Sequence, residues 1–280
     1  MQLFGAIPYP QGMKESTHTI TSLDGSSIAV RRLLPVSAGT QPGAQRAAVW
    51  AFGGGFFSGS VDVCVRVAAE LAEMSQTQIF AVDYRLAPEN PFPKAVEDMY
   101  ATIVWLQANA SSFNVDPSRI VVVGQSAGGG LAAGTALMAR DKGLEPPLAG
   151  QILKYPMLDD RTTIDESSPL WKHLSWTVEF NDMAWNAYLG AERNDENVSP
   201  YAAPARVRDV SRLPRTFIDA GGLDLFRDEN VAYAARLAAA NVDVEFHLYP
   251  GVPHGYDGMA MQIRVTKEAN ANLSRFLSRV

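Results

Sequence analysis

The sequence predicts an α/β fold built around a mostly parallel central sheet. Short, mostly apolar runs recur along the chain, and stretches with helical patterning separate most of them. Strands that read as continuous apolar runs are buried on both faces, which is typical of a parallel sheet covered by helices. With 280 residues, 47% of them hydrophobic, we expect a single domain over 1–280.

The elements follow in order along the chain. Residues 16–22 and 27–35 alternate around the turn sequence LDGS, which predicts a hairpin and hence an antiparallel edge. Six apolar runs predict the remaining strands, at 46–54, 78–85, 119–126, 150–158, 215–222 and 242–250. Helices are expected at 61–75, 94–109, 127–142 and 228–240.

One interval, 160–205, breaks this alternation. It is long for a connection between a strand and a helix, and it contains three tryptophans, Trp171, Trp176 and Trp185. It is interpreted either as a helical insertion that packs its own small core or as a cap over a pocket, and the two interpretations are compatible.

Composition excludes several classes of function. The net charge of −6 argues against nucleic-acid binding, and no apolar run approaches the roughly 20 residues of a membrane span. The first residues lack the basic and apolar regions of a signal peptide. The single cysteine, Cys64, cannot form an internal disulfide and is interpreted as a packing thiol, so we expect a cytoplasmic protein.

A nucleophile is predicted where the run RIVVV meets the next helical stretch. Residues 124–130 read GQSAGGG, and Gly124-x-Ser126-x-Gly128 is the pattern of a serine on a sharp turn between a strand and a helix. The pattern occurs by chance in chains of this length, but here it stands directly between a strand-like and a helix-like segment. Ser126 is therefore the candidate nucleophile.

A serine hydroxyl needs a base, and the chain has four histidines. His18 and His247 fall in strand patterns, and His173 lies in the aromatic interval. His254 lies in a loop after the last strand, at the sheet edge where ligands bind in open parallel sheets, so His254 is the candidate base.

The base needs a carboxylate to orient it. Asp219 falls inside a strand run, and Asp224 lies in the loop that follows. Asp228 begins the next helix, where helix capping is the ordinary role of an aspartate. Asp224 is the preferred partner of His254, and Asp228 is the alternative.

Residues 51–60 read AFGGGFFSGS, and a glycine triplet suits neither a helix nor a strand. The chain order Ser126, Asp224, His254 is that of α/β-hydrolases. In that fold, a loop after an earlier strand donates backbone N–H groups to the oxyanion hole. Gly54 and Gly55 are the expected donors, together with the N–H group of Ala127. The alternative is a tight turn that binds nothing.

The sequence resembles the hormone-sensitive-lipase-like (family IV) esterases of the α/β-hydrolase superfamily over roughly residues 46–256. The resemblance is carried by FGGGFFSGS, by VDYRLAPENPFPKAVEDMYA at 82–101, by GQSAGGG, by YPMLDDR at 155–161, by DLFRDE at 224–229 and by PHGY at 253–256. It implies the α/β-hydrolase fold with a small helical cap, whose elements we expect within about 1–15 and 160–205.

The resemblance also implies a serine carboxylesterase that acts on small, short-acyl esters without a metal or organic cofactor. Its expected partner is a small-molecule ester, with no nucleic acid or membrane, and a homodimer is compatible with it. The expected pocket walls, each equally open to a core role, are Phe56, Phe57, Trp171, Trp176 and Trp185. The alternatives are a biosynthetic or detoxifying hydrolase of a lactone, thioester or amide, and a ligand receptor, against which the presence of His254 argues.

Three features depart from the family pattern. Phe52 stands where the family has a histidine before the glycines, and Gln125 stands where it has Asp or Thr before the serine. The segment before the first strand is about 15 residues long, shorter than in many members. We therefore expect apolar packing to hold the glycine loop, and a reduced cap.

Overall fold

The computed structural model describes residues 9–36, 38, 43–193 and 196–280. Within these residues, eight strands form one sheet in the order β1-β2-β4-β3-β5-β6-β7-β8. The strands are β1 (Lys14–Thr21), β2 (Ser27–Leu34), β3 (Gln45–Ala51), β4 (Gln78–Asp83), β5 (Val115–Gln125), β6 (Gly150–Lys154), β7 (Thr216–Leu223) and β8 (Val244–Pro253). Each predicted strand is present.

The sheet is antiparallel only at one side. β1 pairs with β2, and β2 with β4, in antiparallel register, whereas all the other pairs are parallel. Every residue of β6 is buried, as are most residues of β3, β4 and the second half of β5, while β1 is exposed along most of its length. This difference explains why the inner strands read as apolar runs and the hairpin alternates.

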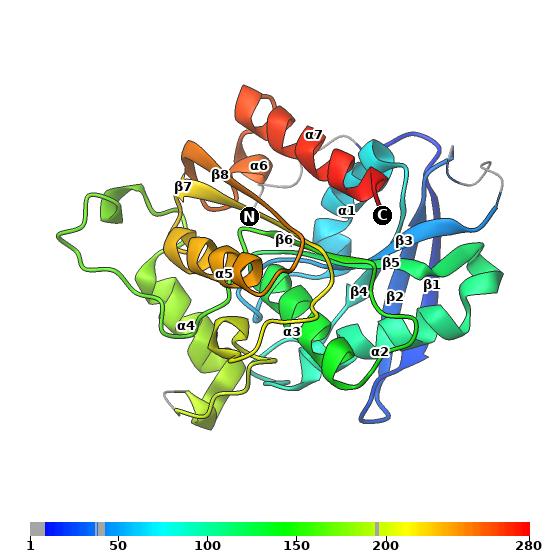
Figure 1. Cartoon of the computed structure of the whole chain (residues 1–280), viewed down its shortest axis with the longest axis horizontal. Helices are drawn as coiled ribbons and strands as arrows, with labels where there is room; N and C mark the ends of the chain where they lie inside the picture. The colour runs from blue at the N-terminus through cyan, green and yellow to red at the C-terminus, as the bar shows by residue number, and fades with distance from the viewer. Residues whose placement is uncertain (1–8, 37, 39–42, 194–195) are drawn as a thin grey trace.

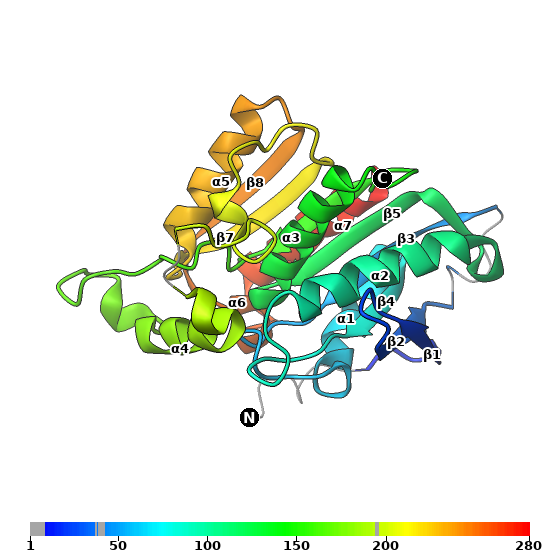
Figure 2. The same cartoon turned by 90° about the horizontal axis from the view of Figure 1, so that it is seen from below.

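Helices cover both faces of the sheet (Figures 1 and 2). α1 (Val61–Ser75) and α7 (Arg264–Ser278) lie together on one face; α2 (Lys94–Ala108), α3 (Ala127–Asp141) and α5 (Arg227–Ala239) lie on the other. A short helix, η2 (Ala110–Phe113), precedes β5. The sequence analysis did not identify α7. Among the described helices, none combines the length and the apolar character needed to cross a membrane.

The interval 160–205 forms a separate group of short helices beside the sheet (Figure 2). It contains η3 (Trp171–His173), α4 (Val178–Leu189), η4 (Gly190–Glu192) and η5 (Pro204–Arg206). Of the other segment expected in a cap, 1–15, residues 1–8 lie outside the described residues, and β1 begins at Lys14.

A buried ion pair and a backbone hydrogen bond hold this helical group in place. The Asp160 carboxylate is fully buried and accepts from Arg206 through both oxygens, at 2.6 Å from Nε and 2.7 Å from Nη2. Phe92 N–H donates to Tyr188 O of α4 at 2.8 Å, which ties the group to the segment after β4. The ion pair thus joins the two ends of the group, and the hydrogen bond from Phe92 joins the group to the rest of the chain.

The parallel strands bring their carboxyl ends to one edge of the sheet. β5 ends at Gln125, β7 at Leu223 and β8 at Pro253, so Ser126, Asp224 and His254 each come directly after a strand. Ligands bind at this edge in open α/β sheets.

Candidate active site

Ser126 lies on a sharp, strained turn between β5 and α3. Its φ is +56°, a conformation that is rare for residues other than glycine, and its N–H donates to Lys154 O at 2.9 Å. Neighbouring glycines are required: a Cβ atom on Gly124 would lie 1.9 Å from Gly128 O, and one on Gly128 would lie 2.3 Å from Ala51 O. Although Ser126 stands at the N-cap of α3, its side chain makes no capping bond to the helix.

Three predicted side chains meet in one hydrogen-bonded row. Ser126 Oγ lies 2.8 Å from His254 Nε2, and His254 Nδ1 lies 2.8 Å from Asp224 Oδ2. A carboxylate only accepts, so the Nδ1–H group donates to Asp224, and the neutral ring then accepts the Ser126 proton at Nε2. This is the arrangement in which a histidine can take a proton from serine.

The row is rigidly held. Asp224 is fully buried, and its Oδ1 accepts from Phe226 N–H at 2.9 Å. The rings of Phe226 and Tyr155 each lie 5.0 Å from the His254 ring in edge-to-face contact. From the helical group at 160–205, Ser175 Oγ donates to His254 O at 2.8 Å.

The rejected candidates lie elsewhere. His18 on β1 hydrogen-bonds Ser16, and His247 on β8 hydrogen-bonds Glu245. Asp228 pairs with Arg227 and its side chain is 75% exposed. Of the two loop carboxylates considered from the sequence, Asp224 is the one in contact with His254.

The glycine loop packs directly against the turn that carries Ser126. A Cβ on Gly53 would lie 3.2 Å from Ser126 Cβ, and one on Gly55 would lie 2.7 Å from Cη2 of Trp176. Gly54 has φ +128°, and its carbonyl accepts from Phe57 N–H at 3.2 Å, so the loop curls tightly. Within the described residues, the N–H groups of Gly54, Gly55 and Ala127 have no acceptor, which leaves them free to donate to a ligand.

Phe52 holds this loop by apolar packing, as expected. Its ring is fully buried and stacks on Tyr84 with centroids 4.2 Å apart and an interplanar angle of 16°. The Tyr84 hydroxyl donates to Phe52 O at 2.8 Å. Ring stacking and one hydrogen bond to the backbone therefore fix the residue before the glycines.

The five predicted pocket aromatics separate into two groups. Phe57 and Trp176 are half-buried next to Gly55, and the Trp176 ring lies 6.3 Å from that of His254. Phe56 and Trp185 are fully buried and pack on each other at 5.3 Å, so they support the loop from the core and present no surface to a ligand. Trp171 is half-buried on η3.

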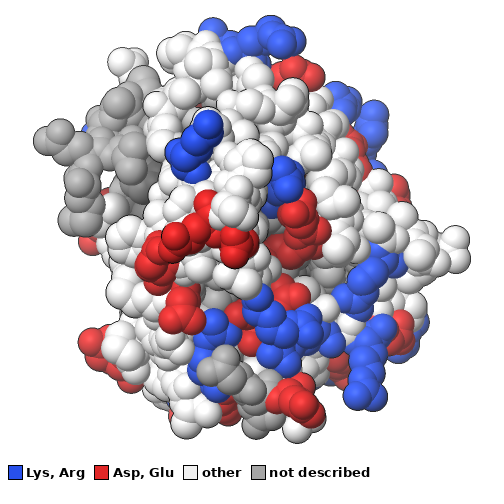
Figure 3. All heavy atoms as spheres, turned by 90° about the vertical axis from the view of Figure 1, so that its left-hand side faces the viewer, with Lys and Arg blue, Asp and Glu red and all other residues white. Residues whose placement is uncertain are grey.

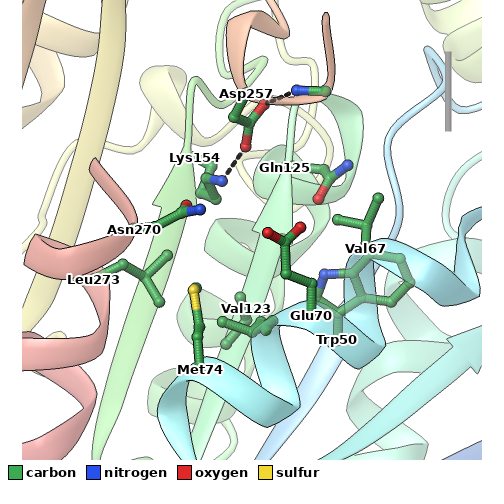
Figure 4. A pocket seen from close by; sticks show the side chains of 13 residues that line it. Trp50, Val67, Glu70, Met74, Val123, Gln125, Lys154, Asp257, Asn270 and Leu273 are labelled. Atoms are coloured by element: carbon green, nitrogen blue, oxygen red, sulfur yellow. Dashed lines mark hydrogen bonds and ion pairs between the residues drawn. The ribbon is translucent and has the colours of Figure 1, made fainter. Parts of the chain in front are cut away.

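A buried charged cluster beside the row was not identified from the sequence. Lys154 Nζ pairs with the Asp257 carboxylate (Figure 4). The Tyr155 hydroxyl donates to Asp257 Oδ1 at 2.6 Å. Burial raises the pKa of nearby Asp219 to about 7, although the Lys154 charge acts to lower it. A buried lysine at the end of an apolar strand was the signal that could have revealed the cluster.

A second buried acid lies under the helical group. Burial raises the pKa of Glu229 well above its ordinary value, and its carboxyl accepts from Leu158 N–H at 2.6 Å and from the Thr162 hydroxyl. Glu229 belongs to the quoted DLFRDE motif and holds the segment that leads into 160–205.

The outer surface carries interleaved acidic and basic side chains, shown for one face in Figure 3. A polar groove of about 600 Å³ lies between α4 and the segments beside it. Its charged lining is largely paired internally, since Arg193 bonds Asp182 at 2.9 Å and Arg206 bonds Asp160. The groove contains none of the three side chains of the row.

The chain is similar to known proteins of the same fold. A family model described as the alpha/beta hydrolase fold matches residues 48–258. Carboxylesterase NlhH of Mycobacterium tuberculosis is 36% identical over 226 residues, which are 79% of this chain and 69% of that protein.

Two solved structures share the whole architecture. A bacterial heroin esterase superimposes with a TM-score of 0.91 at 36% identity, covering 99% of this chain and 87% of the other. A hyperthermophilic esterase from the archaeon Pyrobaculum calidifontis gives a TM-score of 0.86 at 32% identity, covering 98% and 86%.

The packing of Phe52 generates a prediction about stability. Phe52→His should lower the melting temperature, because the imidazole would be buried against Tyr84, whose hydroxyl already donates to the backbone. An unsatisfied buried polar group costs about 1–3 kcal/mol. Thermal unfolding measures the loss, with Phe57→His as the control, since half-buried Phe57 can expose an imidazole to water. An unchanged melting temperature for Phe52→His would show that the imidazole finds a partner in this loop.

Proposed function

The chain belongs to the hormone-sensitive-lipase-like esterases of the α/β-hydrolase superfamily, and we propose that it hydrolyses small, short-acyl carboxylic esters through an acyl-enzyme on Ser126. The observation that carries this proposal is the row Ser126–His254–Asp224, with both contacts at 2.8 Å. Its relatives are carboxylesterases, and the chain is a carboxylic ester hydrolase.

The proposed reaction has two steps. His254 Nε2 takes the Ser126 proton as Oγ attacks the ester carbonyl carbon, and the carbonyl oxygen becomes an oxyanion. The tetrahedral intermediate collapses as the C–O bond to the alcohol breaks, and His254 gives its proton to the leaving oxygen. Water then attacks the acyl-enzyme in the same way and releases the acid. Asp224 accepts from Nδ1–H throughout and stabilises the imidazolium.

Free backbone N–H groups would stabilise the oxyanion. Gly54, Gly55 and Ala127 are the proposed donors, because each lacks an acceptor in the described structure and lies beside Ser126 or on the loop packed against it. Donors fixed before reaction stabilise the developing charge without reorganisation.

Close packing over the loop supports small substrates. A side chain on Gly55 would collide with Trp176 and Phe57, at 2.7 Å and 2.9 Å, so little room lies above the proposed oxyanion donors. We propose that Phe57 and Trp176 form the pocket wall and that 160–205, with the segment at about 1–15, forms the cap of a single domain.

Other acyl substrates are the alternative. A lactone, thioester or amide could use the same row, and a panel of these with short p-nitrophenyl esters separates them by kcat/KM. A receptor function is less supported, because His254 is present and in contact with Ser126. Failure of every ester in the panel would overturn the proposed substrate class.

The cytoplasmic location and the homodimer are also part of this proposal. Cys64, the single cysteine, is buried, and burial raises its thiol pKa to about 11, which suits an inert thiol in a reducing compartment. The mass of the protein in solution tests the homodimer.

Removal of the nucleophile should abolish turnover. Ser126→Ala is expected to keep the fold and to lose roughly 10⁴-fold or more in kcat, because covalent catalysis is gone. A fluorophosphonate should label Ser126 alone, as peptide mass spectrometry would show. Ser111→Ala, at an exposed position on η2, is the control and should keep full activity. Labelling of another serine, with Ser126→Ala still active, would contradict the assignment.

The two candidate carboxylates should differ sharply. Asp224→Asn is expected to reduce kcat by roughly 10⁴-fold, because the amide no longer fixes the tautomer of His254. Asp228→Asn should change little, since its side chain is 75% exposed and contacts Arg227. Steady-state kinetics on both variants decides, and a far larger loss in Asp228→Asn would identify that residue as the acid.

The glycine loop should be intolerant of a single methyl group. Gly54→Ala would place Cβ 2.1 Å from Ser58 O at φ +128°, so the loop must move and misplace its donors. Loss of one oxyanion donor costs about 10²–10³-fold in kcat. Gly25→Ala is the control, because Gly25 has φ +85° but nothing within 4 Å of the added Cβ. Equal kcat values for the two variants would remove the loop from the mechanism.

A further inference from the structure

At the end of β6, one lysine is buried among acidic and phenolic side chains. Lys154 is 8% exposed and pairs with Asp257, which also accepts from the Tyr155 hydroxyl at 2.6 Å. We infer that the buried Lys154–Asp257 pair positions His254 and balances the charge around it, an inference that rests on the proposed function.

The pair joins the two segments whose side chains must meet. Lys154 O accepts from Ser126 N–H at 2.9 Å, so the lysine belongs to the strand end that supports the nucleophile. Asp257 lies three residues after His254 on the short helix α6 (Tyr256–Met259). A link from Lys154 to Asp257 therefore fixes the His254 turn relative to Ser126.

Tyr155 connects the pair to the His254 ring itself. Its φ of +35° is unfavourable for a residue with a side chain, and its N–H donates to Asp219 O at 2.7 Å. In this conformation the phenol ring lies 5.0 Å from the His254 ring at 74°, while its hydroxyl reaches Asp257. The strained backbone thus places one side chain against both the base and the ion pair.

Several ionisable groups surround this region. Asp224 contacts His254 directly, and Tyr256 donates to Asp219 at 3.4 Å. Glu70 of α1 lies across a small cavity of about 30 Å³ from Lys154 and Asp257 (Figure 4), and burial raises its pKa. The groups near the His254 turn are Asp224 after β7, Asp219 of β7, Lys154 and Tyr155 at β6, Tyr256 and Asp257 of α6, and Glu70 of α1.

A balanced pair has a particular consequence for a histidine that becomes charged. The reaction turns His254 into an imidazolium, and charges in a buried region act on it with little screening. Lys154 disfavours the imidazolium and Asp257 favours it, so the two charges of the pair oppose each other. Removal of either partner alone should therefore shift the acid limb of the activity profile, in opposite directions.

The experiment measures kcat/KM against pH for p-nitrophenyl acetate. Lys154→Met removes a positive charge, so the acid limb should move to higher pH; Asp257→Asn removes a negative charge, so it should move to lower pH. Each shift should be about half a pH unit or more. In Lys154→Met the Tyr155 hydroxyl and the Gly258 N–H still donate to Asp257, and both hydrogen bonds favour its charged form. The double variant should return close to the wild-type limb.

An exposed ion pair close in sequence to Asp224 provides the matched control. Arg227 and Asp228 pair at 2.7 Å, with side chains 35% and 75% exposed. Arg227→Met and Asp228→Asn make the same charge changes at positions where water screens them. The acid limb of kcat/KM in these variants should therefore stay within about 0.2 pH units of that of the wild type.

A further variant tests the positioning of the His254 ring separately from the effect of charge. Tyr155→Phe removes one hydroxyl and no charge, so it should lower kcat several-fold, with KM and the acid limb unchanged. It also covers the case in which the charge variants fail to fold. Coincident limbs for all folded variants, or an unchanged kcat in Tyr155→Phe, would overturn the inference.

The rate of Ser126 labelling by a fluorophosphonate is measured over the same pH range. If the acid limb of the labelling rate shifts in the variants but no ester is turned over, the inference is supported and the proposed substrate class is contradicted. If esters are turned over but the acid limb does not shift, the substrate class is supported and the inference is contradicted.

Discussion

The site depends on close contact between backbone segments at the carboxyl edge of the sheet. Gly128 lies so near Ala51 O that a Cβ there would stand 2.3 Å away, and one on Gly130 would lie 2.2 Å from Met157 O. The turn that carries Ser126 is therefore clamped between the glycine loop on one side and the chain after β6 on the other. Only bare backbone permits this spacing, and the spacing brings free N–H groups and the serine hydroxyl to the same place.

Close contact also explains why the loop can lack the family's histidine. Phe52 needs no polar partner, because it stacks on Tyr84 and its carbonyl accepts the Tyr84 hydroxyl at 2.8 Å. Behind the loop, Phe56 stacks on Tyr188 of α4 at 4.1 Å, so the helical group at 160–205 and the loop share one aromatic core. In 160–205, Trp185 belongs to this core, whereas Trp176 lies half-buried next to Gly55.

The sequence predicted what local pattern encodes. The hairpin strands were predicted from their alternation around a turn, and the other six from their mostly apolar runs. Ser126, Asp224 and His254 were singled out because each follows one of those runs. Helix α7 has no capping signal, since Ile263 at its N-cap makes no side-chain bond, but its buried residues Ala269, Leu273 and Phe276 recur at helical spacing and could have revealed it. The buried charged cluster was missed because it depends on distant contacts. Lys154 and Asp257 are far apart in sequence, and neither has a local pattern that points to the other.

Lys154 is buried and paired with Asp257 on the turn that follows His254, and burying such a lysine is costly. Replacing a buried ion pair by well-packed apolar residues is often neutral or favourable for stability. The Lys154 charge acts to lower the pKa of both Asp219 and Asp257, yet burial still raises the pKa of Asp219 to about 7. A cluster selected for stability alone would have no need of a second carboxyl beside one lysine. His254, however, gains and loses a positive charge during the reaction, and the cluster sets the electric field at its ring. Tyr155, held in a strained backbone conformation, links the cluster to the His254 ring through direct contact.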